Sequence, residues 1–346
     1  MKTKHLFEYK EIDKRFYEER IRDFLPEKFI DVHTHIWART KTDGKSDNRS
    51  TSWPTRVADQ CLVEELIGTY KTMFPGKKVT PLVFSGLPER DKLDSFNSYV
   101  ETSALKNNLP SLIFSDPSWT KETLEKKIIS GKYSGAKSYL SLAPENIATE
   151  DITIYDFFPK EHFEVFNKLG LVVMLHIPRK KRLSDPINIS QLIEIEKNFP
   201  DVKLIVAHVG RSYCLSDIGD AFEKLSVCEK MLFDISANTN EFVFEELIKS
   251  VGPKRILFGS DMPITRMRMR RIERNASYVN IVPKGLYGDV SGDPNMMEAD
   301  GDEAEKLSFF IYEEIAAFKR AAEKTSLSKS DIEDVFYNNS RRILKI

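Results

Sequence analysis

Apolar runs recur along this chain, and each is followed by a segment with a helical pattern. Several runs, such as LVVML and KLIVA, are almost continuously apolar. Such runs are typical of strands buried on both faces of a parallel sheet. The pattern predicts eight strands: Phe29–Ile36, Val79–Leu87, Leu109–Pro117, Gly135–Leu142, Leu171–Pro178, Val202–Gly210, Met231–Ser236 and Arg255–Pro263.

Amphipathic segments between these runs predict helices. In Val57–Met73, apolar residues recur near the helical period. Gln191–Phe199 has the same character, and Ser190 just before it is a candidate N-cap. Alternating strands and helices indicate parallel βαβ units.

Eight such units favour a closed (β/α)8 TIM barrel over an open doubly wound sheet. The first run carries His33 and His35, and the last carries Asp261. In a barrel the first and last strands are neighbours, so these side chains can meet, whereas in an open sheet they could lie far apart. The predicted fold class is therefore α/β, with a single barrel domain over residues 29–346.

Three segments are additional to a bare barrel. Residues 1–28 predict a helical extension packed on the outside of the barrel or across its bottom. The polar stretch Trp37–Thr55 follows the first strand, and Ile264–Lys306 follows the last. Loops at these strand ends lie over the catalytic face of a barrel, so both segments are candidate lids.

Composition narrows the function classes. The net charge of 346 residues is −1, so no global field attracts nucleic acid or an anionic membrane. No apolar stretch is long enough to span a bilayer, and the charged N-terminus lacks a signal-peptide core. The three cysteines form no CxxC, which favours a reducing compartment. We expect a cytoplasmic protein with a small-molecule substrate, and a homo-oligomer is compatible with these features.

The positions of the histidines carry the strongest chemical signal. Of six histidines, four fall inside or at the ends of predicted strands: His33, His35, His176 and His208. Ring nitrogens buried in a core need hydrogen-bond partners. Four histidines late in their strands therefore indicate convergence at one end of the barrel.

The sequence HTH has a direct geometric interpretation. Because strand side chains alternate, His33 and His35 are expected on one face, with Val32 and Thr34 on the other. Two imidazoles on one face could bind one metal ion, or they could be core histidines bonded to neighbours. Asp31 would share their face, either orienting a ligand imidazole or simply starting the strand.

Asp261 ends the eighth run, in ILFGSDMP. A carboxylate after a buried strand is costly unless it is paired or bound to a metal. It could instead be the N-cap of a following helix, with Pro263 near the first turn. Its placement matches that of the histidines, which favours the functional interpretation.

Two cationic residues are candidate substrate ligands. Lys137 on the fourth run could be carbamylated between two metals, could bind a substrate carboxylate, or could face solvent. Arg211 could bind an anionic substrate or be an exposed loop residue.

His5 and His162 fall in polar surroundings and are expected at the surface. No aromatic residues interrupt the basic run Arg266–Arg274, which argues against a nucleic-acid groove. Its position after Asp261 favours contact with an acidic substrate or a neighbouring subunit.

Taken together, DVHTH, the strand-end His176, AHVG and GSDMP resemble the amidohydrolase superfamily, in particular its amidohydrolase-2 branch, from about Phe29 to the C-terminus. The closing YNNSRRILKI also resembles that branch. The resemblance implies a distorted (β/α)8 barrel with a divalent metal, zinc or manganese. It implies His33, His35, His176 and Asp261 as metal ligands. His208 would be the catalytic histidine of a one-metal site or a ligand in a two-metal site.

The residues and the resemblance together predict a hydrolase that opens a small cyclic ester or amide, such as a lactone, with a metal-activated water. Asp261 would take the water proton and pass it to the leaving group, while His208 polarises the carbonyl or shuttles protons. The alternative is a non-oxidative decarboxylase of an aromatic or unsaturated acid. A third possibility, a non-catalytic barrel, predicts that Asp261→Asn retains function.

Overall fold

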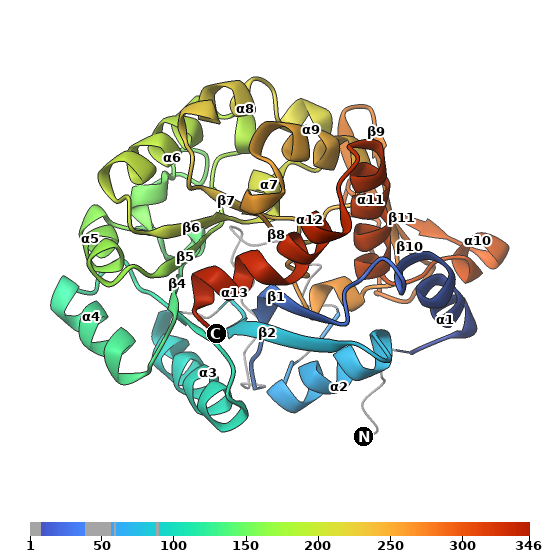
Figure 1. Ribbon diagram of the computed structural model, residues 1–346, viewed down its shortest axis with the longest axis horizontal. Coiled ribbons are helices and arrows are strands. Elements are labelled where there is room, and N and C mark those ends of the chain that lie inside the picture. The colour runs from blue at the N-terminus through green and yellow to red at the C-terminus, as the bar shows by residue number, and fades with distance from the viewer. Residues whose placement is uncertain (1–7, 39–56, 59, 88–89) are drawn as a thin grey trace.

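A computed structural model describes residues 8–38, 57–58, 60–87 and 90–346. Parallel strands lie in all eight predicted runs (Figure 1). The strands are shorter than the runs, because the carboxyl-terminal residues of several runs already belong to loops. Their bounds are β1 Lys28–His35, β2 Lys78–Phe84, β3 Leu112–Phe114, β4 Gly135–Lys137, β5 Val172–Leu175, β6 Lys203–Val206, β7 Leu232–Asp234 and β8 Ile256–Leu257.

These strands form a closed ring. β1 pairs with β2, and β3 to β8 pair in sequence order. A bridge between Val83 and Ser111 connects β2 to β3, and a bridge between Thr34 and Met262 connects the end of β8 to β1. The first and last strands are therefore neighbours, and the predicted α/β barrel is confirmed.

Helices surround the ring on its outer side (Figure 1). The main ones are α2 Val63–Met73, α3 Leu93–Asn107, α4 Lys121–Ser130, α5 Lys160–Leu169, α6 Pro186–Asn198, α9 Glu241–Val251 and α11 Phe310–Lys324. Shorter ones are α1 Glu11–Phe16, α7 His208–Arg211, α8 Ala221–Lys224, α10 Gly301–Glu305, α12 Lys329–Glu333 and α13 Asn339–Leu344.

Two predicted helix starts were wrong. α2 begins at Val63 rather than Val57, because Cys61 first pairs with Trp37 in an antiparallel bridge. α6 is capped by Asp185, whose carboxylate accepts the backbone N–H groups of Ile187 and Asn188 ahead of a proline at the first turn. Ser190 lies inside this helix and donates its hydroxyl to the carbonyl of Ile187.

β1 contains an irregularity that matters for the site. Its pairing with β2 shifts register between Asp31 and Thr34. The ring centroid of Phe84 on β2 lies 5.3 Å from that of His33 and 4.6 Å from that of His35. The two histidines therefore face the same side, as predicted.

The residues around them do not follow the simple alternation. Val32 packs in the apolar cluster inside the barrel, on the side of the histidines. Asp31 points the other way: Tyr70 of α2 donates its hydroxyl to Oδ2 at 2.6 Å. The Oδ1 atom of Asp31 accepts the backbone N–H groups of His33 and Ser260. The expected shared face of Asp31 and the histidines was wrong, because the bulge reverses the alternation.

The amino ends of the strands are closed by the C-terminal helices. Ile343 and Leu344 of α13 pack into the apolar interior of the barrel beside residues of β1 and β8. Asn339 donates to the carbonyls of Pro253 and Ile256 at the start of β8. The opposite, carboxyl ends of the strands carry the polar residues discussed below.

The N-terminal extension and the segment after β8 lie beside each other (Figure 1). The segment forms a small sheet of β9 Arg270–Arg274, β10 Ser277–Pro283 and β11 Met296–Ala299. We call residues 264–306, which include this sheet, the insertion. Arg268 of the insertion pairs with Asp13 of α1 at 2.6 Å, and both side chains are buried.

The basic run is consequently not a solvated surface. Arg266, Arg268 and Arg271 are buried, while Arg270 between them is exposed. Every residue from Thr265 to Met269 is buried, so burial here follows from tertiary packing, which a count of charges does not reveal. Arg268 serves the attachment of α1, so the predicted contact of the whole run with substrate or a subunit was wrong for this residue.

Three other sequence features have clear outcomes. His162 was expected at the surface but is buried, with Nε2 lying 2.8 Å from the carbonyl of Trp119. The three cysteines are free and buried. Among the described residues, none of the helices has the length and apolar character needed to cross a bilayer. His5 and most of the Trp37–Thr55 segment lie outside the described residues.

Candidate metal centre

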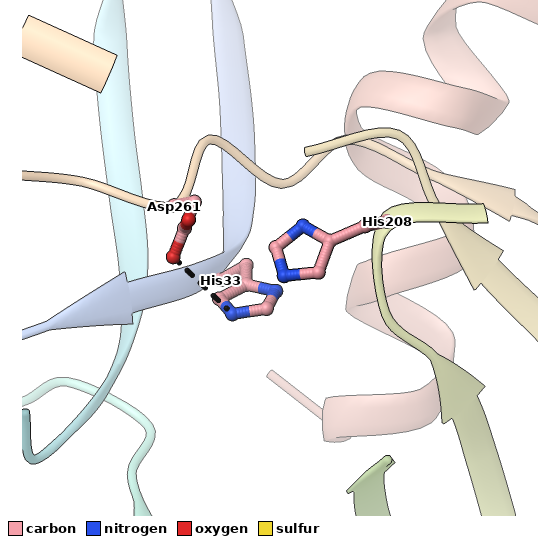
Figure 2. Close-up of side chains that lie close together, drawn as sticks. All are labelled: His33, His208 and Asp261. Carbon is pink, nitrogen blue, oxygen red and sulfur yellow. Dashed lines mark ion pairs between the residues drawn. The ribbon is translucent and has the colours of Figure 1, made fainter. Parts of the chain in front are cut away.

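Three buried side chains from distant parts of the chain meet at the carboxyl end of the barrel. Donor atoms of His33, His208 and Asp261 all lie within 4.8 Å of one another. Figure 2 shows Asp261 and His33 facing each other, with the ring of His208 directed toward them from the loop that follows β6. Imidazole and carboxylate are common ligands of zinc and manganese.

The backbone at these positions takes conformations that direct the side chains inward. His208 has φ 56° and Asp261 has φ 64°, both in the left-handed region. Such conformations are uncommon outside glycine and cluster at functional sites. The backbone N–H of Asp261 donates to the carbonyl of His33 at 2.8 Å, which fixes the loop after β8 against β1. The side chain of Asp261 faces histidines, so it does not act as a helix N-cap.

Gly259, just after β8, lies against His33 of β1 and Asp234 of β7. A Cβ atom there would lie 2.9 Å from the Cβ of His33 and 3.4 Å from the Cβ of Asp234. The first distance is shorter than a normal contact between carbon atoms. The glycine in GSDMP is therefore required by the packing of His33.

Each of three histidines has its Nδ1 atom engaged by an acceptor. Nδ1 of His33 lies 2.9 Å from Oδ2 of Asp234, and Nδ1 of His35 lies 2.8 Å from the carbonyl of Ser85. Nδ1 of His208 lies 3.0 Å from the carbonyl of Ser236. Since carboxylates and carbonyls only accept, these contacts assign the proton of each neutral ring to Nδ1 and leave a lone pair on Nε2.

The Nε2 atoms of His33 and His35 then face the negatively charged carboxylate of Asp261 rather than a hydrogen-bond donor. Oδ1 of Asp261 lies 3.1 Å from Nε2 of His35 and 3.6 Å from Nε2 of His33. A lone pair and a carboxylate oxygen at this separation repel unless a cation lies between them. The donor set therefore fits a divalent metal ion.

Asp234 and Ser236 hold these histidines in place. Besides the ring of His33, the carboxylate of Asp234 accepts the backbone N–H groups of His208 and Ser236. The Ser236 hydroxyl donates to Asp234 and lies 3.2 Å and 2.9 Å from the Nδ1 atoms of His33 and His208. Burial opposes the charge of Asp234, but the His33 ring and these bonds outweigh it and lower its pKa.

Neither residue was predicted from the sequence, although a signal was present. Asp234 and Ser236 end the seventh run, in MLFDIS. They share with His208 and Asp261 a polar side chain at the carboxyl end of an apolar strand. The same criterion that selected the histidines would have selected them.

His176 lies at the edge of this group. Its ring centroid is 5.3 Å from that of His208 and 4.8 Å from that of Tyr139. Its Nδ1 atom is buried and has no hydrogen-bond partner among the described residues. Burial, followed by the charge of Arg211, lowers its pKa well below the usual value. A neutral ring with an unused nitrogen is suited to bind a metal or a substrate.

The pKa values of the other groups favour the same charge state. Burial lowers the pKa of His33 to about 4 and also lowers that of His208. Burial opposes ionisation of Asp261, but the adjacent rings of His35, His33 and His208 outweigh it and lower its pKa. His33, His176 and His208 are therefore neutral and Asp261 is ionised, which is the form that metal binding requires.

Lys137, at the end of β4, is buried inside the barrel. Its Nζ atom lies 5.2 Å from the ring centroid of Phe84 and forms no ion pair or hydrogen bond with any residue that the structure describes. Burial lowers its pKa to about 8, although Asp261 and Asp234 act in the opposite direction. The predicted solvent-facing alternative is wrong, and the lysine is a positive group near Asp261 and Asp234.

Arg211 is half-buried directly after the His208 turn. Its Nη1 atom donates to the carbonyls of Ile177 at 3.3 Å and Pro178 at 3.1 Å. These bonds attach the loop after β5, which follows His176, to the loop after β6. Arg211 is therefore not a freely exposed loop residue.

A buried carboxyl of α11 supports the loop after β7. Oε2 of Glu314 accepts the backbone N–H of Ala237 at 2.7 Å, while Oε1 has no hydrogen-bond partner among the described residues. Burial raises the pKa of Asp31 to about 7. Burial likewise raises the pKa of Glu314 well above its usual value. Glu314 is therefore a neutral acid that holds the backbone next to Ser236.

Known proteins resemble this chain in sequence and in fold. A family model described as Amidohydrolase matches residues 97–273, which include His176, His208 and Asp261. No curated protein matches the chain significantly.

Solved structures resemble the chain over nearly its whole length. An amidohydrolase from Burkholderia multivorans with bound zinc has a TM-score of 0.57 at 13% identity, covering 92% of this chain and 99% of that one. A probable 2-pyrone-4,6-dicarboxylic acid hydrolase from Acinetobacter baumannii has 0.55 at 13%, with the same coverage. A dihydroxybenzoic acid decarboxylase from Polaromonas with manganese has 0.53 at 14%, covering 92% and 97%. At these identities the likeness shows the fold.

Proposed function

This chain belongs to the amidohydrolase family, and from that premise we propose that it is a metal-dependent hydrolase that opens a small cyclic ester or amide, such as a lactone. The observation that carries the proposal is the convergence of neutral imidazole nitrogens on the carboxylate of Asp261. The resemblance to structures described as hydrolases supports the reaction class.

The proposed metal ligands are His33, His35, His176 and Asp261. The first two present Nε2 lone pairs toward Asp261, and His176 has an unused ring nitrogen. Zinc is the first candidate and manganese the second, since similar structures are described with either ion. A divalent ion at this place supplies a positive charge that acidifies water and polarises a carbonyl group.

Asp261 is the proposed general base. Its second carboxylate oxygen can accept a proton from water and return it to the leaving group, as general acid–base catalysis requires. Its fixed backbone bond to His33 keeps the carboxylate directed into the barrel. The buried ammonium of Lys137 supplies positive charge that would stabilise an oxyanion formed nearby.

His208 is the proposed proton shuttle. Because Nδ1 is bonded to the Ser236 carbonyl, Nε2 can accept a proton but has none to donate at first. This favours proton transfer over polarisation of the substrate carbonyl, the other role considered from the sequence. In a two-metal site the same lone pair would make His208 a ligand.

The second candidate function is non-oxidative decarboxylation of a small aromatic or unsaturated acid. A specific observation favours it: Lys137 and Arg211 place two cationic groups near His176 and His208, and such groups could bind a substrate carboxylate. Similar structures include dihydroxybenzoate decarboxylases. In this reaction the substrate carboxylate would leave as carbon dioxide, and a proton would take its place on the carbon.

One experiment separates the two functions. The zinc- and manganese-loaded proteins are incubated with a panel of lactones and a panel of hydroxybenzoates, and ring opening and carbon dioxide release are measured. We expect ring opening without carbon dioxide release, and release of carbon dioxide would select the decarboxylase. Full activity after complete metal removal would contradict both.

Variants of two buried histidines test whether catalysis depends on His208. We expect His208→Gln to lower kcat by roughly 100-fold or more, as is typical for loss of general acid–base catalysis. His162→Gln removes another buried histidine, on the outer helix α5, and should leave kcat unchanged. Equal activity of the two variants would exclude the proposed role of His208.

A further inference from the structure

The insertion after β8 extends to the neighbourhood of the metal centre through Arg271. This residue on β9 is buried, and its Nη1 atom donates to the carbonyl of Ala237, the residue after Ser236. Its Nε atom donates to Asn280 of β10 at 2.8 Å. Two nitrogens of the guanidinium group are thereby fixed in orientation.

The third nitrogen of Arg271, Nη2, has no hydrogen-bond partner among the described residues. Arg271 also forms no ion pair with any carboxylate in the described part of the chain. Buried arginines are usually paired with an anion, since an unpaired buried charge is costly. The guanidinium is therefore a fixed positive group with an unused donor.

Aromatic rings replace the missing carboxylate. The Cζ atom of Arg271 lies 4.7 Å from the ring centroid of Tyr213, 4.5 Å from that of Tyr278 and 4.6 Å from that of Phe310. Contacts of this kind hold a cation in place without neutralising it. The charge of Arg271 remains available to an anionic group.

The same two tyrosines contact a second arginine. The Cζ atom of Arg182, in the loop after β5, lies 5.0 Å from the ring of Tyr213 and 5.3 Å from that of Tyr278. Arg182 is already paired with Asp217. Arg182 and Arg271 therefore stack on the same two tyrosine rings. Arg182 has a carboxylate partner, whereas Arg271 has none among the described residues.

Tyr213 connects this stack to the metal centre. Its ring centroid lies 6.5 Å from that of His208, and its hydroxyl makes no hydrogen bond with any residue in the described ranges. Burial is the largest effect and raises its pKa, although the charges of Arg271 and Arg211 act in the opposite direction. The phenol thus remains protonated and can donate a hydrogen bond to an anion.

We propose that Arg271 and Tyr213 form a carboxylate-binding subsite for a part of the substrate that does not react. This inference rests on the proposed function, which places the reacting group at His33, His35 and Asp261. A substrate with one small ring and a second carboxylate would extend from the metal cluster past His208 to this subsite. The insertion therefore selects the substrate, and the substrate class is a small cyclic compound with a carboxylate remote from the reacting bond.

The guanidinium and the phenol favour a carboxylate for a geometric reason. Arginine donates in a planar fork, which matches the two oxygens of a carboxylate. The phenol can add a third donor to the same group. A neutral substituent would leave the charge of Arg271 unpaired on binding.

Direct binding tests the subsite without turnover. Isophthalate, with two carboxylates on one ring, and benzoate, with one, are titrated calorimetrically into the full-length, metal-loaded protein. The wild type should bind isophthalate at least roughly 10-fold more tightly than benzoate, because charge-assisted hydrogen bonds are strong. A wild type that shows no preference for isophthalate would overturn the proposal.

Two arginine variants make the test specific. Arg271→Met should weaken isophthalate binding by roughly 10- to 100-fold and leave benzoate binding unchanged. Arg270→Met is the matched control, because Arg270 is on the same strand but exposed, and it should keep the wild-type preference. If Arg271→Met binds isophthalate as the wild type does, or loses both ligands equally, the subsite is excluded.

A third variant covers a folding defect of Arg271→Met. Tyr213→Phe keeps the ring that stacks on both arginines and removes only a hydroxyl that makes no hydrogen bond within the described residues. It should weaken isophthalate binding by roughly 3- to 10-fold with no change for benzoate. If Arg271→Met does not fold, wild-type affinity of Tyr213→Phe for isophthalate would overturn the proposal.

Failure of the proposed function alone would give a different result. Turnover would then not depend on the metal, while isophthalate binding would still depend on Arg271.

Discussion

The Nδ1 atom of His33 lies 2.9 Å from Oδ2 of Asp234, and both side chains are buried. This contact joins β1 to β7 across the interior of the barrel. It fixes the proton of His33 on Nδ1 and directs the Nε2 lone pair toward Asp261. Asp234 thus determines which nitrogen is available to a metal, although its own carboxylate is fully engaged by protein donors.

The first prediction concerns this carboxylate. Asp234→Asn should lower metal affinity by about 10- to 100-fold, the usual effect of losing a partner that orients a ligand imidazole. Competition with a chelator measures the affinity. Asp334→Asn provides the control, because Asp334 is a buried carboxylate near the amino end of β8. Equal metal affinity of the two variants would exclude an orienting role for Asp234.

The second prediction concerns the close approach at Gly259. In Gly259→Ala, the new methyl group would lie 2.9 Å from the Cβ of His33, so His33 must move away from Asp261. We expect metal affinity to fall by at least about 10-fold, since ligand geometry tolerates only small displacements. Gly68→Ala, where nothing lies within 4 Å of the added atom, should retain wild-type affinity. Unchanged affinity in Gly259→Ala would show that the packing at β8 is looser than described.

The third prediction tests the protonation of Glu314. Because burial raises its pKa well above the usual value, the side chain is neutral, and Glu314→Gln should change the free energy of unfolding by less than about 0.5 kcal/mol. Glu314→Ala leaves the N–H of Ala237 without its acceptor and should cost about 1–3 kcal/mol. Urea denaturation measures both. A large loss in Glu314→Gln would mean that the carboxyl is ionised.

The fourth prediction is a pH dependence of stability from His162. Burial is the main reason that its folded pKa is lowered from 6.5, and its buried Nδ1 has no partner among the described residues. The unfolded chain therefore takes up the proton first, so this contribution to stability is complete above pH 6.5 and is lost as the pH falls below it. Thermal melts from pH 7.5 to 5 should show a larger decrease in Tm for the wild type than for His162→Gln. Parallel pH profiles would refute this assignment.

The sequence predicted the barrel and several of the side chains that converge at its carboxyl end for physical reasons. Strands buried on both faces of a parallel sheet appear in the sequence as apolar runs. Burying a polar residue at the end of such a run costs free energy unless the residue has a partner. That reasoning located His33, His208 and Asp261, which the structure brings together. It applied equally to Asp234, which was overlooked because a lone aspartate is a weaker signal than a histidine.

Other features could not be obtained from local patterns. The bulge in β1 moves Asp31 out of the barrel, and alternation alone does not reveal where a register shifts. The burial of Arg268 and Arg271 depends on Asp13 and on Tyr213, far away in sequence. Tertiary contacts of this kind decide whether a charged run faces solvent, and only the folded chain shows them.

The central claim is that neutral imidazoles and Asp261 bind one divalent metal ion. Anomalous diffraction from crystals of the zinc- or manganese-loaded protein tests it most directly. We expect one strong peak about 2.0–2.2 Å from Nε2 of His33 and of His35 and from a carboxylate oxygen of Asp261. Absence of a peak at these atoms in fully loaded protein, or a peak bound only elsewhere, would contradict the account.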